Sequence, residues 1–179
     1  LSIIQGYIET LHMKDAELSP KEREEYLNTI SKSSERLSKL VSQLFEYSKL
    51  EANQIEPEKE PCLISELAND IHRNYSLLAE KKNIDLKLAM KENIPLVFAD
   101  ISLVERAIQN LMDNALKFTP SKGEVTIELR SSKKDVFISV KDTGPGISQD
   151  EQSYIFERFK KAPSSKESHL GAGLGLAIA

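Results

Sequence analysis

Apolar residues at the start of the chain recur every three or four positions, the spacing of an amphipathic helix. They predict one helix over residues 1–12. A second helix is predicted to begin at Pro20, with Ser19 as its N-cap, and to run to about Gln54. Its apolar positions are heptad-like and comprise Leu27, Ile30, Leu37, Leu40, Val41, Leu44 and Tyr47.

Two such helices, packed antiparallel, cannot bury both of their apolar faces against each other alone. The simplest expectation is therefore a homodimer through residues 1–54, in which two copies complete a four-helix bundle. The alternative is that the helical hairpin packs against the rest of its own chain.

The segment 56–61 (EPEKEP) is charged and contains two prolines, so it is predicted to be a linker. Beyond it, apolar stripes predict helices over residues 67–78, with Leu78 on the stripe, and over 101–118. Alternating patterns predict strands at 84–88, 95–99, 125–129 and 136–140, the last two forming an antiparallel hairpin around the turn 131–135. Strands that face a few helices, without strict β–α–β alternation, predict an α+β sandwich.

Composition narrows the functional classes. The chain has 24 basic and 28 acidic residues, a net charge of −4, so no general attraction to nucleic acid or to anionic membranes is expected. No apolar run approaches the length of a membrane span. The lone Cys62 excludes an internal disulfide and makes a reducing, cytoplasmic setting the simplest expectation. The chain begins at Leu1 without a methionine, and we expect it to be part of a longer protein.

The predicted helix 101–118 has polar residues that share one face. Asn110, Asn114 and Lys117 follow the spacing i, i+4, i+7. Two amides and an ammonium group together can offer a metal-ligating oxygen and donors to phosphate. An ordinary solvated face explains the same pattern and is the more common case. Asparagine is a middling helix former, however, so two of them four apart are not explained by helix propensity.

Five of the seven glycines fall in two clusters. The first is the turn Asp142–Ile147 (DTGPGI), expected directly after a strand that ends at Val140. Its carboxylate could accept a hydrogen bond from an exocyclic amine while Gly144 and Gly146 leave room for a flat ring. A simple turn accounts for this sequence equally well.

The second cluster is 171–176 (GAGLGL), which precedes a predicted helix start and could bind phosphate through backbone amides. It is neither a dinucleotide fingerprint nor a P-loop, and the protein-kinase signatures are absent from the sequence. Between the clusters, two aromatic residues in 156–161 (FERFKK) precede a polar segment, the composition of a lid or of a plain surface loop.

In this order, the four segments resemble the nucleotide-binding motifs of bacterial sensor histidine kinases. Residues 110–119 (NLMDNALKFT) resemble the N box, and DTGPGI the G1 box. Residues 156–159 (FERF) are similar to the F box, and 171–178 (GAGLGLAI) to the G2 box. Residues 1–7 (LSIIQGY) resemble the stretch after the family's H-box proline, and 36–51 its second dimerisation helix. The resemblance covers nearly the whole chain.

The resemblance implies a role for each matched residue. Asn114 matches the Mg²⁺ ligand, Asn110 the polar residue one turn earlier, and Lys117 and Arg158 match cations that contact the phosphates. Asp142 matches the carboxylate that binds the adenine amino group. The remaining nucleotide-binding positions implied in the same way are Phe118, Gly144, Gly146, Ile147, Phe159, Gly171, Gly173, Leu174 and Gly175. Asn110, Lys117 and Arg158 are the implied catalytic residues.

The family's phosphoacceptor histidine is the notable departure, because its motif precedes the residue matched by Leu1 and does not occur in this sequence. His12, His72 and His169 lie elsewhere and are expected to be surface or packing residues. The resemblance implies an acceptor about six residues upstream, since that is where the family's motif lies relative to Leu1.

The resemblance thus implies a partial dimerisation hairpin over residues 1–55 and a truncated ATP-binding domain over 56–179, of the histidine kinase, gyrase and chaperone type. ATP and Mg²⁺ are the implied cofactors. The implied activity is transfer of the γ-phosphoryl group to a histidine and then to an aspartate on a response-regulator receiver domain. The alternatives are another ATPase of the same nucleotide fold, and a pseudokinase that serves as a scaffold or phosphatase.

Overall fold

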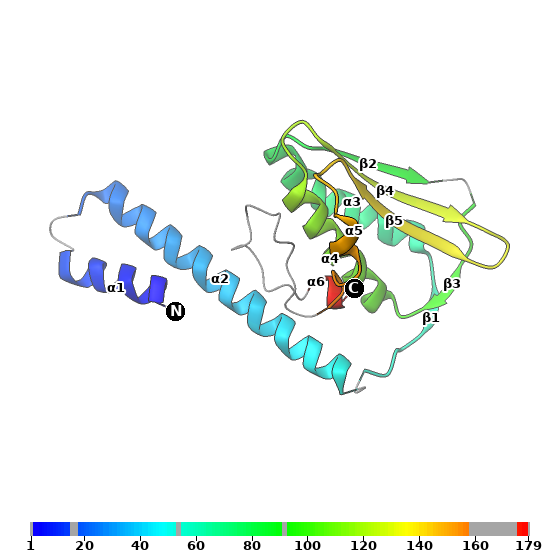
Figure 1. Cartoon of the computed structure of the whole chain (residues 1–179), viewed down its shortest axis with the longest axis horizontal. Coiled ribbons are helices and arrows are strands. Elements are labelled where there is room, and N and C mark those ends of the chain that lie inside the picture. The colour runs from blue at the N-terminus through cyan, green and yellow to red at the C-terminus, as the bar shows by residue number, and fades with distance from the viewer. Residues whose placement is uncertain (1, 15–17, 53–54, 91–92, 158–174, 179) are drawn as a thin grey trace. The chain divides into compact units, whose positions relative to one another are not determined.

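The computed structural model describes residues 2–14, 18–52, 55–90, 93–157 and 175–178. The chain divides into two compact units, Leu1–Ser48 and Lys49–Ala179, and each is described by itself. Their elements confirm the expected order of N-terminal helices followed by an α+β domain (Figure 1).

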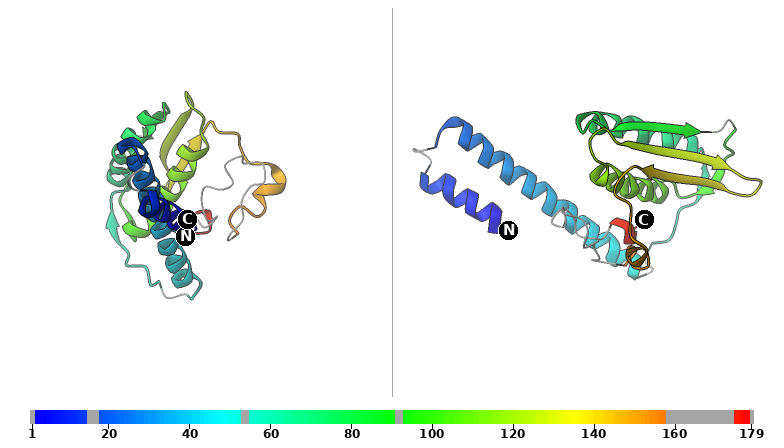
Figure 2. Two further views of the ribbon diagram at one scale, coloured as in Figure 1. Left: turned by 90° about the vertical axis from the view of Figure 1, so that its left-hand side faces the viewer. Right: turned by 45° about the horizontal axis from the view of Figure 1, so that its top comes forward.

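The first unit consists of α1 (Ser2–Lys14) and most of α2 (Pro20–Glu51), which run antiparallel (Figures 1 and 2). The rings of Tyr7 and Tyr26 meet at 5.0 Å between centroids. Ser19 caps α2 as predicted, because its hydroxyl accepts from the Glu22 amide while the Glu22 carboxylate accepts from the Ser19 amide and hydroxyl. The helix ends at Glu51, three residues before the predicted end.

Much of the apolar surface of α2 is exposed. The exposed large side chains of this helix are Leu27, Leu37, Val41, Leu44 and Phe45. A face of this kind, on a helix of 32 residues, is what a further packing partner would cover.

The second unit is built on a three-stranded sheet of order β2–β4–β5. Its strands are β2 (Asp85–Met90), β4 (Glu124–Ser131) and β5 (Val136–Asp142). Strand β2 is parallel to β4, and β4 is antiparallel to β5 through the predicted hairpin. A separate antiparallel pair joins β1 (Glu60–Cys62) to β3 (Val97–Ala99).

Two helices, α3 (Ile64–Lys81) and α4 (Ile101–Phe118), pack on one face of this sheet (Figures 1 and 2). The central strand β4 alternates strictly, so that Val125, Ile127 and Leu129 are fully buried against the helices. The opposite face of the sheet is polar, since Lys87 pairs there with Glu124, and Glu128 pairs with Arg130 and Lys141. The core therefore lies in a single layer between helices and sheet.

Among the differences from the prediction, three are explained by particular contacts. Leu78 is exposed because α3 buries the smaller Ala79 instead, where the chain turns back and the Ile84 amide donates to the Ala79 carbonyl. The predicted linker 56–61 is shorter, because Glu60 and Pro61 already belong to β1 and pair with β3. Strand β5 continues past Val140, since Asp142 still pairs with Val125 of β4.

Candidate functional site

Helix α4 begins at a strong cap and buries one side. The Asp100 side chain accepts from the Ser102 amide at 3.0 Å and the Leu103 amide at 3.1 Å. The buried side of the helix comprises Ile108, Met112, Ala115 and Leu116. With this stripe fixed against the sheet, polar residues on other faces of α4 can make contacts.

The predicted polar face of α4 is present. Asn110, Asn114 and Lys117 are all partly exposed. Within the described part of the chain, no hydrogen bond is formed by the side-chain amides of Asn110 and Asn114. The Lys117 ammonium nitrogen lies 4.5 Å from the centroid of the Phe118 ring. The two amides thus retain both donor and acceptor capacity for a ligand.

The Asp142 turn lies against the end of this helix. Asp142 is exposed at the last position of β5, and its Oδ1 accepts from the Gly144 amide at 2.8 Å. An ideal Cβ on Gly144 would lie 2.6 Å from that same oxygen and 3.2 Å from the Phe118 carbonyl oxygen. Gly146 has φ of +73°, a conformation that glycine adopts without strain. The two glycines are therefore required for different reasons. Gly144 allows the turn to lie close to Asp142 and Phe118, and Gly146 allows a positive φ.

Sequence reasoning gave no role to Gly123, which allows three segments to meet behind this turn. An ideal Cβ there would lie 2.4 Å from Thr119 Cγ2 and 2.8 Å from Thr143 Oγ1. Thr143 also ties the turn to β4, because its hydroxyl accepts from the Glu124 amide at 2.9 Å. A lone glycine between a predicted helix and strand was the available signal, and it is a weak one.

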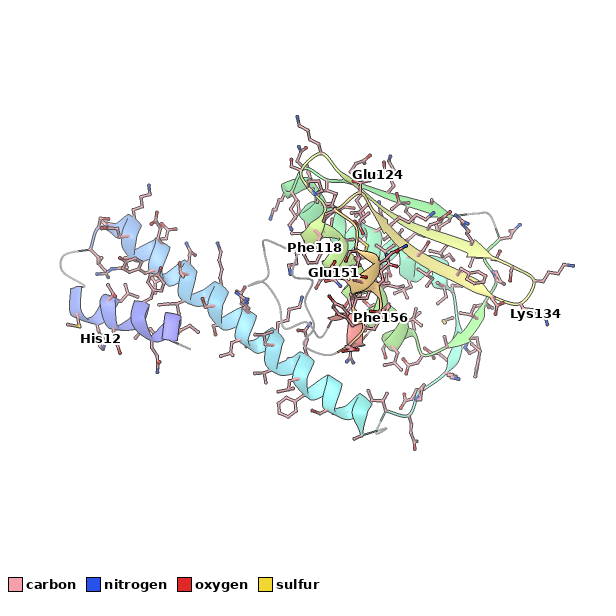
Figure 3. The ribbon with its side chains drawn as sticks, in the orientation of Figure 1. His12, Phe118, Glu124, Lys134, Glu151 and Phe156 are labelled. Atoms are coloured by element: carbon pink, nitrogen blue, oxygen red, sulfur yellow. The ribbon has the colours of Figure 1, made fainter. Side chains whose placement is uncertain are left out.

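The segment after the turn is anchored by a capping box. The Ser148 hydroxyl accepts from the Glu151 amide at 3.3 Å and donates to the Glu151 carboxylate at 2.7 Å, which starts α5 (Gln149–Gln152). Ile147, before the cap, is exposed. Phe156, after the helix, is exposed as well (Figure 3).

The rest of the predicted site lies partly outside the described residues. Those positions are Arg158, Phe159, Gly171, Gly173 and Leu174. The last glycine of the second cluster, Gly175, begins α6 (Gly175–Ile178), which packs against α4. Three of the four sequence motifs thus have residues that meet at α4, namely the helix itself, the Asp142 turn and the start of α6.

A hydrogen bond from α3 also holds α4 in place. The Tyr75 hydroxyl of α3 donates to Asp113 Oδ1 at 2.9 Å, and burial, followed by the charge of Asp113, raises the pKa of Tyr75. At the start of the helix, the hydrogen bonds from Ser102 and Leu103 lower the pKa of Asp100. The Tyr75 contact, which joins α3 to α4, restrains the rotation of α4 and hence the direction in which its polar face points.

The described residues include no group of three histidine, cysteine, aspartate or glutamate side chains able to hold a metal ion. A metal at this site would therefore depend on an amide oxygen together with phosphate oxygens, a donor set that suits Mg²⁺.

Two cavities, of about 400 and 650 Å³, lie elsewhere in the second unit, and none of the predicted site residues lines them. None of the described helices has the length and hydrophobicity needed to cross a bilayer.

Comparison with known families matches both parts of the chain. Residues 1–53 match the His Kinase A (phospho-acceptor) domain. Residues 99–179 match the family described as histidine kinase-, DNA gyrase B-, and HSP90-like ATPase.

Individual proteins are similar over nearly the full chain. An aerobic respiration control sensor protein ArcB homolog of Haemophilus influenzae is 34% identical over 92% of this chain and 50% of its own length. Full-length ShkA in complex with AMPPNP has a TM-score of 0.76 at 29% identity, over 99% of this chain and 36% of that one. Histidine kinase ThkA in complex with response regulator protein TrrA has a TM-score of 0.73 at 26% identity, over 96% and 52%. This chain spans 20% to 50% of the length of curated relatives of this kind.

Proposed function

Because this chain belongs to the histidine kinase family of two-component signalling systems, we propose that it is the catalytic core of a sensor kinase. It binds Mg-ATP and transfers the γ-phosphoryl group to a histidine, from which the group passes to a response-regulator aspartate. The observation that carries this proposal is that the Asp142 turn and α6 both contact α4, the turn at Phe118. The pseudokinase alternative is not favoured, since both halves of the chain match kinase families.

Adenine binds at the Asp142 turn in this proposal. The exposed carboxylate of Asp142 accepts from the exocyclic amine, and Phe118 and Ile147, both exposed beside it, offer apolar surface to the ring. Gly144 leaves the space that a flat ring next to Asp142 requires, and Gly146 gives the turn its positive φ.

The triphosphate lies along α4 and the start of α6. Lys117 and Arg158 offset the charge that develops on the transferred group, and Asn110 orients it. In this proposal, backbone amides of Gly171, Gly173, Leu174 and Gly175 bind phosphate oxygens, and Phe159 is a further nucleotide-binding position.

Asn114 fits the role of Mg²⁺ ligand. Its amide is partly exposed, and within the described residues it has no hydrogen-bond partner, so its oxygen is available to a hard cation. A bound Mg²⁺ would neutralise phosphate charge and hold the γ-phosphoryl group in line for transfer.

The helical hairpin serves as the dimerisation and phosphotransfer part, over residues 1–55, and the ATP-binding domain covers 56–179. The exposed apolar face of α2 supports a homodimer through residues 1–54. A receiver domain is the proposed partner for onward transfer, and histidine kinase ThkA has a known structure in complex with response regulator protein TrrA. The buried, unpaired Cys62 agrees with the proposed cytoplasmic setting.

A phosphorylation assay with γ-labelled ATP tests this assignment. We expect the present chain to bind ATP but to remain unlabelled, since in-line transfer fails when the acceptor is displaced even slightly. His12 lies on α1 about 18 residues beyond the expected acceptor, roughly 27 Å along a helix (Figure 3). His72 belongs to α3, where its Nε2 lies 3.3 Å from the Leu86 carbonyl oxygen.

Extending the chain with the upstream helix and its histidine should restore an acid-labile phosphate. Label on His12 would relocate the acceptor. Failure of the chain to bind ATP at all would refute the proposed function.

A further inference from the structure

The connector that follows α2, residues 55–59, is bonded to the helix that holds the proposed nucleotide residues. The Glu58 amide donates to Asp100 Oδ2 at 3.0 Å, across 42 positions of sequence. The other oxygen of the same carboxylate, Oδ1, accepts from the amides of Ser102 and Leu103 and caps α4. One side chain thus joins two segments that are far apart in the chain.

The strand pairing explains why a side chain makes this bond. Strand β1 pairs with β3 in the register Glu60–Ala99, which would place Lys59 opposite Asp100 at the next step. The backbone cannot continue that ladder because the chain turns into α4 at Ile101. The Asp100 carboxylate instead adds one hydrogen bond beyond the end of the β1–β3 pair, to the amide of Glu58 in the connector.

The two oxygens of the Asp100 carboxylate have separate roles, since Oδ1 caps α4 and Oδ2 binds the connector. Serine would cap α4 as well as aspartate does, since both are favoured N-cap residues. Its single hydroxyl, on a shorter side chain, cannot also reach the Glu58 amide. A cap alone therefore does not explain the choice of a carboxylate, whereas a cap together with the connector bond does.

We propose that Asp100 is a positioning residue that couples the course of the connector to the orientation of α4. The proposal rests on the proposed function, since the coupling acts on the nucleotide through α4. The helix is 18 residues long, and Asn110 lies about 15 Å along it from Asp100. A helix packed against a sheet moves as a rigid element, so a ligand that fixes Asn110 and Asn114 also restricts Asp100 and its bond to Glu58.

Linkage makes the coupling measurable from both ends. If bound nucleotide strengthens the connector bond by some factor, breaking that bond must weaken nucleotide binding by the same factor. Exchange of the Glu58 amide with deuterium reports the connector end. Titration with Mg-ADP reports the nucleotide end.

The variants separate the connector bond from the cap. Asp100→Ser keeps the cap and loses the bond, and Glu58→Pro removes the donating N–H while Asp100 is unchanged. Glu58→Ala is the matched control, because it keeps the N–H and alters only an exposed side chain. Without nucleotide, the Glu58 amide should exchange about tenfold faster in Asp100→Ser than in wild type, as expected for loss of one hydrogen bond to a charged group.

With Mg-ADP, exchange at Glu58 should slow further in wild type, by roughly threefold or more, and should not respond in Asp100→Ser. The Kd for Mg-ADP should rise by that same factor in Asp100→Ser and Glu58→Pro and stay at the wild-type value in Glu58→Ala. Binding of Mg-ADP that leaves Glu58 exchange unchanged in wild type overturns the coupling alone. Absence of any Mg-ADP binding by wild type overturns the proposed function, and the coupling with it.

Discussion

Replacing Gly144 with alanine tests the proposed adenine contact with a single methyl group. The new Cβ would lie 2.6 Å from Asp142 Oδ1 and 3.2 Å from the Phe118 carbonyl oxygen. The carboxylate is the end of an exposed side chain and can rotate away, whereas the carbonyl belongs to the last turn of α4. The methyl group should therefore displace Asp142 and leave the turn folded.

The two costs differ in size. Folding loses the exposed hydrogen bond from the Gly144 amide to Asp142 and gains a tight contact, together about 1 kcal/mol. Binding loses a charge-assisted hydrogen bond to the adenine amine, about 1.5–3 kcal/mol, which weakens ADP by roughly 10- to 100-fold. The variant should therefore melt close to wild type but bind ADP poorly.

Comparing ADP with inosine diphosphate isolates the base contact, because inosine lacks the exocyclic amine. Wild type should prefer ADP by about the factor given above, and Gly144→Ala should lose the preference. Gly146→Ala is the matched control, since nothing lies within 4 Å of its ideal Cβ but its φ of +73° strains alanine by about 1–2 kcal/mol. It should lose stability and keep the preference for ADP. A Gly144→Ala protein that still discriminates the two nucleotides would refute this role for Asp142.

Three further outcomes are expected. Asn114→Ala should abolish the Mg²⁺-dependent part of ADP affinity in calorimetry with little change in melting temperature, and equal Mg-ADP affinity would exclude it as the ligand. Leu37→Glu with Leu44→Glu should convert the dimer to a monomer in sedimentation, because two exposed apolar positions of α2 would become buried charges in a bundle; an unchanged mass would contradict the dimer. Tyr75→Phe should lower unfolding stability by about 1 kcal/mol in urea at neutral pH. The pKa of Tyr75 is raised above its usual 10.0, so its contribution to stability is fully present below pH 10.0 and is lost as the pH rises from there toward the raised pKa. A variant as stable as wild type at neutral pH would refute this contribution.

The pattern of apolar and polar residues predicted the helices and strands whose signals lie within the element itself or at its ends. The helix 101–118 has the predicted bounds, because both its cap at Asp100 and its stop before Pro120 are local signals. The β4–β5 hairpin likewise follows from alternation on both sides of a polar turn. The family assignment, made from four ordered motifs, is confirmed by the matches over both halves of the chain.

What the pattern missed depends on contacts distant in sequence. Strand β1 has three residues, one of them Pro61, and it is a strand only because β3 pairs with it more than 30 residues later. Gly123 is needed because Thr119 and Thr143 approach it from two other segments. Neither requirement leaves a periodic signal in the residues around it, so a single sequence does not contain the information in a local form.

The strongest functional signals in this sequence occur where local preference is set aside. Two asparagines sit in the middle of α4, where better helix formers would serve stability, and both lack a partner among the described residues. Asp142 ends a strand and stays exposed. A methyl group on the neighbouring Gly144 would push its carboxylate out of place. A fold selected only for stability would replace these residues with better packed ones. These residues, two on α4 and one in the turn that contacts the last residue of α4, therefore support the proposed nucleotide site, because a bound ligand would supply the contacts that they lack.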